Sequence, residues 1–595
     1  SFLYGIADDQ TGNDLTIKDN SSIEFYATNG PMIKVGGNAT AGIITNSGTL
    51  IRERFSGLGN YKPALDMGTN AYAQAFINNG RMYWAGTHVI ALWGNSHIGT
   101  IRNTGTIQTE GVAIGVGSSG TNNVTIDSIE LDGGVLQHIS NSSSANNVIP
   151  TAGDVINLAN NANVGKIIVS NGASIHGNIS LSRTTITDKI SFSDSNMTGN
   201  ISLGGSRIAN GISIDGSNIS GNISIKAGSG VHSTITNGLS IDNSKITGNI
   251  TLANQSTIAN GLSLSGNSTI ANLNLTDRGY IDTLSLNQGT ITGGISLTGN
   301  ADGTGTNTAT IGEITLANTS TITGNINIKG SNTSNNAKIG SITLGNNTGI
   351  GGSIVVGDSN AKGTIDTITL NGNASIGGIT GNNGIISTLT LGETSSIGTI
   401  VNSATIANLN LSENGTITNG ITNNANGNIG TIISNTNDGV SNTITNSGTI
   451  GSLEIKNENT GGNGGTIVYR SDSGIITDTL SVASGATLDI KDSTGSNTGT
   501  IELRNNSAIL EDGSTLNLAN GSTLVGHLKN SGNLGDWTNE SNIQGHFINT
   551  GTIGILNAGN IAEYLQNSGV IHILKQGKIT GTLNNTGTIG ELNTS

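Results

Sequence analysis

Arginine and the large aromatic residues are the side chains in this chain best suited to recognition, and they gather near its beginning. Trp, Tyr and Arg often anchor glycan or protein contacts, because each combines a broad contact area with a polar group. We therefore predict a ligand-binding site made of Arg52, Arg54, Tyr61, Arg81, Tyr83, Trp84 and Trp93. The alternative is that these aromatic residues cap one end of a hydrophobic core.

Spacings typical of catalytic or metal sites are largely absent from the sequence. The acidic pair Asp8-Asp9 lies far from basic partners, and Ser96 and His97 are adjacent, which in a strand directs them to opposite faces. The glycine-rich segment 461–465 lacks the Asp that calcium-binding repeats require. Because the chain also has no cysteine and no serine-hydrolase nucleophile motif, we expect no enzymatic activity, no metal site and no cofactor. The histidines are scattered, at positions 88, 97, 138, 176, 232, 527, 546 and 572.

The secondary-structure elements that carry these residues can be predicted from a repeat in the sequence. Units of the form I-x-G-N-I-S-L follow one another at a constant interval, and in each unit apolar residues alternate with Ser or Thr, as in Ile201-Ser202-Leu203. This period of two predicts a short, half-buried strand in each unit. The first five units begin at Ile175, Ile186, Met197, Ile208 and Ile219, with equal separations of 11.

Two kinds of unit alternate, so one full coil takes two units where nothing is inserted. Further along the chain the two kinds of unit still alternate. Units of one kind begin at Ile311, Ile339 and Ile365, with separations of 28 and 26 residues. Units of the other kind begin at Ile322, Ile350 and Ile376, with the same separations. Near the end, N-[ST]-G-x-[IL] units predict shorter coils. They begin at Asn530, Asn549, Asn567 and Asn585, with separations of 19, 18 and 18.

The repeat predicts an all-β fold, a right-handed parallel β-helix forming a single elongated rod. A helical solenoid is excluded, because Gly every few positions costs a helix about 1 kcal/mol each. Parallel crossovers are nearly always right-handed. We expect Ile to fill a narrow interior, and Asn side chains stacked at the corners of the coils to form hydrogen-bonded ladders.

Composition divides the chain near residue 150. Of the 17 aromatic residues, 11 lie in the first 93 positions, and Pro31, Pro63 and Pro150 are the only prolines. We therefore predict a capping, decorated start of the solenoid over residues 1–150 and a regular shaft over residues 151–595.

The I-x-G-N-I-S-L units, the N-[ST]-G-x-[IL] units and the segment 484–490 (SGATLDI) resemble the passenger domains of Gram-negative classical type V autotransporters. The repeat style is similar to that of epsilonproteobacterial adhesins and of the vacuolating-cytotoxin-like group. The resemblance implies export, display on the cell surface or release outside the cell, and a C-terminal outer-membrane β-barrel translocator in the full-length protein. We expect that barrel to lie outside this sequence, because few aromatic residues follow position 500.

The resemblance implies an adhesin that binds a host cell-surface protein or glycan, or the same protein on neighbouring bacteria. A secreted toxin and a polysaccharide-degrading β-helix enzyme are the alternatives. A net charge of −14, spread thinly and without a basic patch, argues against nucleic acid as a partner.

Overall fold

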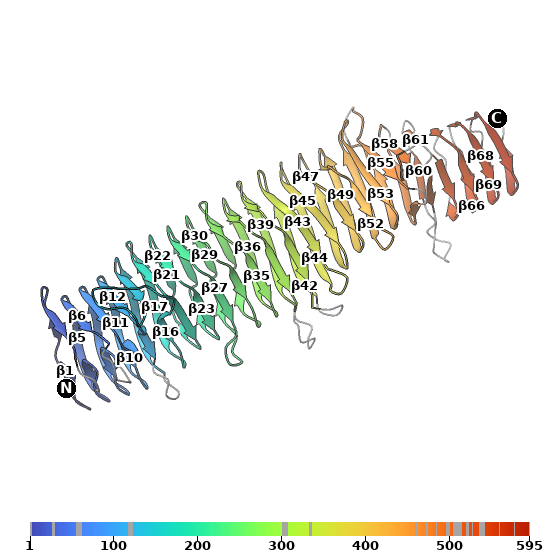
Figure 1. Cartoon of the computed structure of the whole chain (residues 1–595). Coiled ribbons are helices and arrows are strands. Elements are labelled where there is room, and N and C mark those ends of the chain that lie inside the picture. The colour runs from blue at the N-terminus through green and yellow to red at the C-terminus, as the bar shows by residue number, and fades with distance from the viewer. Residues whose placement is uncertain are drawn as a thin grey trace. The chain divides into compact units, whose positions relative to one another are not determined.

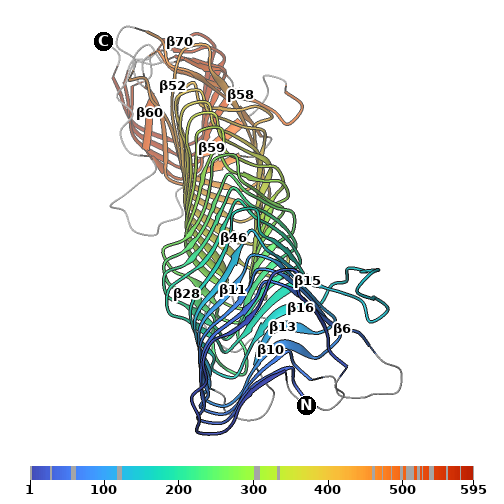
Figure 2. The same cartoon turned by 90° about the vertical axis from the view of Figure 1, so that its left-hand side faces the viewer.

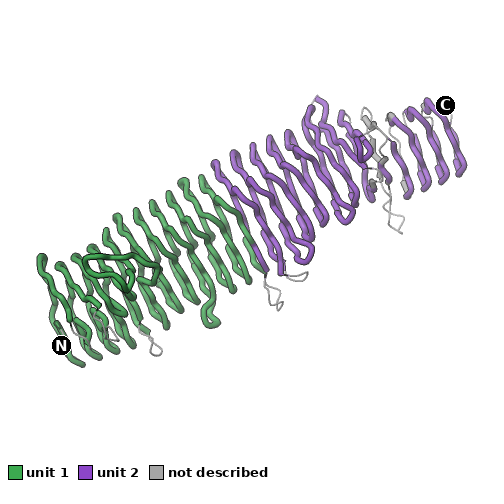
Figure 3. The backbone as a smooth tube through the Cα atoms, in the orientation of Figure 1, with its two compact units in different colours: residues 1–296, 308–312 green, residues 297–307, 313–595 purple. Residues whose placement is uncertain are grey.

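The structure, a computed structural model, consists of strands, turns and loops, and none of its described residues forms a helix. It divides into two compact units, one of residues 1–296 and 308–312 and the other of residues 297–307 and 313–595 (Figure 3). The described residues are 3–26, 30–54, 62–116, 123–299, 308–331, 336–458, 462–471, 474–483, 485–495, 500–503, 515–518, 523–525, 527–534, 542–557, 560–575 and 578–593.

The first unit is a stack of coils, and each coil near its start contributes three strands. One coil contains β8 (Tyr72–Asn78), β9 (Arg81–Trp84) and β10 (His88–Leu92). The next contains β11 (His97–Asn103), β12 (Thr106–Thr109) and β13 (Val112–Val116), and each strand pairs in parallel with its counterpart. Figures 1 and 2 show how successive coils of the unit wind around the same interior. The first unit is therefore a parallel β-helix.

Each I-x-G-N-I-S-L unit corresponds to half a coil, as predicted. Strands β19 (Asn178–Ser182), β23 (Ile201–Gly204) and β27 (Ile223–Lys226) lie side by side, with Ile179 opposite Ile201 and Ile201 opposite Ile223. Each step between these partners advances the chain by two units of the repeat. All three Ile side chains are fully buried, so the alternating pattern directs its apolar residues inward.

The second unit is also a parallel β-helix, and its coils have the predicted lengths. Between β42 (Ala337–Leu344) and β44 (Gly363–Leu370), Ile339 pairs with Ile365, and between β43 (Gly349–Val356) and β45 (Ser375–Gly381), Ile350 pairs with Ile376. These are the partners expected from the spacing of the repeat in the sequence.

The N-[ST]-G-x-[IL] units form the last coils of the second unit. Strands β62 (His527–Asn530), β65 (Phe547–Asn549), β68 (Tyr564–Asn567) and β71 (Thr582–Asn585) stack in that order. A further parallel stack joins β63 (Asn533–Leu534), β66 (Thr552–Leu556), β69 (Val570–Lys575) and β72 (Thr588–Asn593). The Asn residues of successive repeats are direct partners, which confirms the register predicted from the sequence.

Isoleucine and leucine fill the interior of both units, but asparagine also lies there, in hydrogen-bonded ladders. In the first unit the Asn46 amide donates to Asn78 Oδ1, and the Asn78 amide donates to Asn103 Oδ1, both over 2.7 Å. In the second unit Asn402 donates to Asn423 over 2.8 Å, and Asn423 donates to Asn446 over 2.7 Å. Every one of these side chains is buried. The predicted ladders therefore exist, and they run inside the coils.

The described part of residues 1–150 already contains strands that stack in parallel from coil to coil. The first strand, β1 (Tyr4–Ile6), pairs in parallel with β4 (Ile33–Val35), and β4 pairs with β7 (Leu65–Met67). An excursion from the coils follows β15 (Val135–His138), where antiparallel bridges join Ile139 to Pro150 and Ser144 to Asn147. The two compact units meet in sequence near residues 297–312, whereas the division at 150 remains a prediction from composition.

Candidate binding surfaces

The N-terminal residues predicted to bind a ligand include three that are buried. Tyr83 and Trp84 are fully buried, and only 3% of Arg52 is exposed. The Arg52 guanidinium lies 5.3 Å from the centre of the Trp84 ring and 5.7 Å from that of Phe25. Arg52 Nη1 and Trp84 Nε1 both donate to the Lys62 carbonyl, over 2.7 and 3.1 Å. Side chains this buried present no surface to a partner, which corrects the ligand-contact prediction for these three residues.

The excursion of residues 139–150 explains why Tyr83 is covered. Tyr83 and Ala85 pack against Ile139 and Ala145 in one apolar cluster. The backbone of Ala145 is held on both sides, because its N–H donates to Glu53 Oε1 over 2.7 Å and its carbonyl accepts from the Arg81 guanidinium. Burial raises the pKa of Tyr83, so its hydroxyl stays protonated. The sequence predicted neither the position of this excursion nor the residues against which it packs.

Three of the remaining predicted residues are at least partly exposed, and each contacts a different neighbour. Arg54 forms an ion pair with Glu110, with Nη2 2.5 Å from the carboxylate. Arg81 also donates to Gln108 Oε1 over 3.2 Å. Trp93 Nε1 donates to Asp66 Oδ1 over 2.7 Å, while burial raises the pKa of that carboxyl. Tyr61 lies outside the described residues.

Columns of hydroxyl groups on the outward faces of the coils form a second candidate surface. One column in the first unit consists of serine alone, with each residue directly opposite the next on the following coil. All its members are partly or fully exposed, because they alternate with buried Ile, Leu or Phe along each strand. We call this the serine column, and it contains Ser191, Ser213, Ser240, Ser263 and Ser285.

The second unit has a similar column. Its residues come from β42, β44, β46 (Gly384–Leu391), β49 (Thr405–Glu413) and β52 (Asn428–Thr436), and all are at least partly exposed. Ser, Thr and Asn side chains both donate and accept hydrogen bonds, so such a column offers repeated polar contacts without a fixed charge. We call it the mixed column, and it contains Ser341, Thr367, Thr388, Asn408 and Thr431.

A charged groove of about 440 Å³ on the first unit bears on the enzyme alternative. Its carboxylates have close partners: Glu130 lies 3.5 Å from Lys166 Nζ, and Asp132 accepts from Asn171 over 2.6 Å and from Arg102. The Asn171 and Arg102 hydrogen bonds lower the pKa of Asp132, so that carboxyl remains ionised at neutral pH. A general acid requires the opposite shift. The pKa of Asp132 is therefore shifted away from that of a general acid.

One group of side chains near the end of the second unit has the composition of a metal site. His527, His546 and Glu563 come from three successive coils, and one donor atom from each lies within 4.8 Å of the others. The histidines are scattered along the sequence, and this group was not predicted from it. The signal was available in the spacing, because His527 and His546 have the same separation as Asn530 and Asn549, which is one coil of the N-[ST]-G-x-[IL] repeat.

The fold and these surfaces define the chain as a parallel β-solenoid with repetitive polar outer faces. No family model, curated protein or solved structure matches the sequence. Among the residues that the structure describes, no helix is long and apolar enough to cross a membrane.

Proposed function

We propose that this chain is the passenger of a type V autotransporter and acts outside the cell as an adhesin. The observation that carries the proposal is the outward repetition of hydroxyl and amide groups, with the serine column in the first unit and the mixed column in the second. The resemblance of the repeats to autotransporter passengers supports the route of export.

Repetition supports adhesion because many weak contacts add to a strong attachment. A second contact on the same rigid scaffold forms at high effective concentration, so avidity exceeds the affinity of any one contact. Neutral hydroxyl groups suit partners that present their own hydroxyl groups at intervals, such as cell-surface glycans, and they also suit a second copy of the same face. The partner we propose is a host cell-surface glycan or glycoprotein, and self-association between bacteria is the other arm of the test.

The test compares wild-type residues 1–595 with a variant that places lysine at three successive positions of the serine column. Ser213→Lys, Ser240→Lys and Ser263→Lys together add bulk and like charge along the face, and the half-exposed or exposed side chains leave the interior intact. A matched control carries Thr187→Lys, Ala209→Lys and Thr236→Lys, which follow the stacked residues Ile186, Ile208 and Ile235 at the adjoining turn.

Fluorescently labelled proteins are applied to cultured epithelial cells and, separately, to beads coated with the wild-type chain. We expect the column variant to lose at least about tenfold in binding on one of the two surfaces, while the control keeps wild-type binding. Loss on cells alone identifies a host ligand, and loss on beads alone identifies self-association. If the wild type binds neither surface, or if the column variant binds as well as the wild type, the proposal is wrong.

A further inference from the structure

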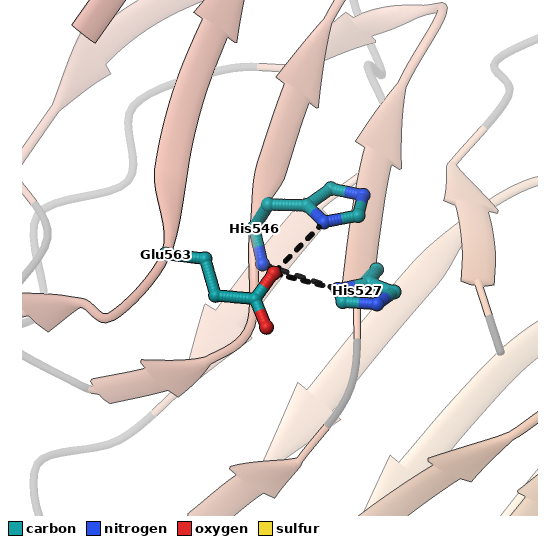
Figure 4. A group of neighbouring side chains, drawn as sticks. All are labelled: His527, His546 and Glu563. Carbon is teal, nitrogen blue, oxygen red and sulfur yellow. Dashed lines mark hydrogen bonds and ion pairs between the residues drawn. The ribbon is translucent and has the colours of Figure 1, made fainter. Parts of the chain in front are cut away.

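The strand register places His527, His546 and Glu563 at neighbouring positions on three consecutive coils. His527 opens β62, His546 directly precedes β65 and Glu563 directly precedes β68. Because Leu528 pairs with Phe547 and Phe547 pairs with Leu565, the two histidines lie opposite each other, with Glu563 beside them. Figure 4 shows both imidazole rings on the same side of the coils as the Glu563 carboxylate.

The donor atoms converge on that carboxylate. His546 Nδ1 lies 3.2 Å from Glu563 Oε2, and His527 Nδ1 lies 3.9 Å from the same oxygen. Around a tetrahedral zinc ion with bonds of about 2.0–2.2 Å, neighbouring donor atoms lie about 3.4 Å apart. The His546–Glu563 distance is already close to this value, whereas the His527–Glu563 distance is about 0.5 Å longer, so an ion requires a change mainly in the imidazole rings.

The protonation of His527 also fits a ligand. The backbone N–H of His546 donates to His527 Nδ1 over 3.2 Å, so this nitrogen carries a lone pair rather than a proton. An imidazole nitrogen with a lone pair is the donor that a metal ion requires, and an ion bound there takes the place of this hydrogen bond.

Ring stacking and a single hydrogen bond give a simpler account of part of this group. The His527 and His546 rings stack with centres 3.6 Å apart, and His546 stacks on Tyr564 at 4.4 Å. A hydrogen bond between His546 and Glu563 accounts for a second contact. Together with the bond from the His546 N–H to His527 Nδ1, these contacts hold the three side chains within 4.8 Å of one another, close enough for one cation to be shared among them.

We propose that His527, His546 and Glu563 bind one divalent transition-metal ion of the zinc type. Two imidazole nitrogens and one carboxylate oxygen suit zinc and its neighbours, whereas calcium and magnesium prefer oxygen ligands alone. The histidine side chains are only 12% and 15% exposed, while Glu563 is 53% exposed, so the fourth position opens to solvent on the Glu563 side. Since the two rings are nearly parallel, binding requires one of them to rotate about its Cβ–Cγ bond.

The ion would join three coils that are otherwise held by strand pairing and the asparagine ladder. Because it binds the folded arrangement and spans residues 19 and 17 positions apart, it stabilises these coils in proportion to its occupancy. This inference concerns a different surface from the hydroxyl columns, and either proposal can fail without the other.

The experiment titrates metal-stripped residues 1–595 with Zn²⁺ by calorimetry, and with Co²⁺ by visible absorption, which reports the coordination geometry. The variants are His527→Asn, His546→Asn and Glu563→Gln. The matched control is His572→Asn, because His572 lies exposed on β69 of the same coils. Circular dichroism of each metal-free variant checks that the β-helix is retained.

We expect one equivalent of Zn²⁺ per wild-type chain, a four-coordinate Co²⁺ spectrum, and a rise in thermal stability on Zn²⁺ addition. Each single variant should bind at least about tenfold more weakly, and the control should match the wild type. The proposal is overturned if the wild type takes up no stoichiometric Zn²⁺. It is equally overturned if the His527→Asn, His546→Asn double variant retains wild-type affinity and spectrum, since the ion then binds elsewhere.

Discussion

Asparagine side chains recur from coil to coil in the interior, where they hydrogen-bond to one another. A buried amide is costly unless both its oxygen and its nitrogen are hydrogen-bonded. Asn423 meets this condition fully: its oxygen accepts from Asn402, and its nitrogen donates to Asn446 Oδ1, to the Gly427 carbonyl and to the Thr449 carbonyl. Each rung therefore depends on the coils on either side of it.

Replacing Asn423 with Ala should destabilise the second unit by about 2–3 kcal/mol, because the substitution leaves buried partners of the amide unsatisfied. The effect should be local, since each coil contacts mainly its neighbours. Hydrogen exchange should accelerate in β48 (Ile400–Asn402), β51 (Ile421–Asn423) and β53 (Ser441–Asn446). Asn419→Ala is the control, because Asn419 is exposed on the same coil. Equal exchange in both variants would show that the ladder contributes little.

The aromatic residues near the N-terminus show what residue types alone leave open. The sequence identified Trp84 and Arg52 as unusual, and it offered recognition and capping as the two explanations. Which explanation applies depends on whether each side chain points into or out of the coil. That direction is set by the register of β9 against β6 (Thr49–Arg52) and β12, which a single sequence does not specify.

Trp84→Leu should lower the free energy of unfolding of the first unit by about 2–4 kcal/mol, because it removes a buried ring and its hydrogen bond to Lys62. Arg54→Gln should cost less, about 1–2 kcal/mol, since Arg54 itself is half exposed but the Glu110 carboxylate that loses its cation is only 5% exposed. Urea unfolding followed by circular dichroism measures both. A Trp84 variant that is fully stable yet deficient in cell binding would restore the recognition hypothesis for this residue.

At the scale of elements, the sequence predicted the strands and their pairing well. Alternation of Ile or Leu with Ser or Thr located the strands, and the spacing of the repeats gave the coil lengths that the register confirms, such as Ile179, Ile201 and Ile223. The packing of residues 139–150 could not be predicted, because contacts such as Glu53 with Ala145 join residues 92 positions apart without any repeat. The histidine group was missed although His527 and His546 lie one coil apart in the repeat, because Glu563 joins them from a different position of its own coil.

The glycine of the N-[ST]-G-x-[IL] unit has a steric role at the turn between strands. A Cβ atom on Gly569 would lie 2.0 Å from the Gly551 carbonyl oxygen of the preceding coil, and the same close approach recurs at Gly551 and Gly587. Stacked coils therefore touch through backbone alone at this corner. The motif requires Asn for the ladder and Gly for this contact.

Gly569→Ala should destabilise the last coils by about 3 kcal/mol, because the backbone of two coils must separate to admit the methyl group. Gly439→Ala separates this effect from conformational strain, since Gly439 has a φ of +82° but no atom within 4 Å of the added methyl group. The control should cost about 1 kcal/mol. Limited proteolysis and thermal unfolding compare the two, and a larger loss for Gly439→Ala would contradict the steric explanation.

At the scale of the whole molecule, similar coils recur along the chain while charged residues are few. Only 10% of its residues are charged, and several of the charged side chains on the outer faces are paired, as in Lys338 with Asp366 and Arg102 with Asp132. The outer faces therefore display mainly neutral hydrogen-bonding groups. Attachment through such faces should depend on the number of contacts engaged and only weakly on ionic strength.

The dependence of attachment on the number of contacts can be measured on the mixed column of the second unit. Thr388→Lys alone should weaken binding to the surface that wild-type residues 1–595 recognise by less than about threefold, because the neighbouring coils still bind. Thr367→Lys, Thr388→Lys and Asn408→Lys together should weaken it by more than about tenfold, since losses of contacts within one rigid array multiply. Replacing the same three residues with Ser keeps a hydrogen-bonding group on each coil and should leave binding close to that of the wild type.

Dissociation rates from the coated surface give the comparison most directly, because affinity differences between related complexes lie mainly in dissociation. A single lysine as damaging as three would mean that one contact dominates, and the adhesive face would then be a discrete site rather than a repeated one.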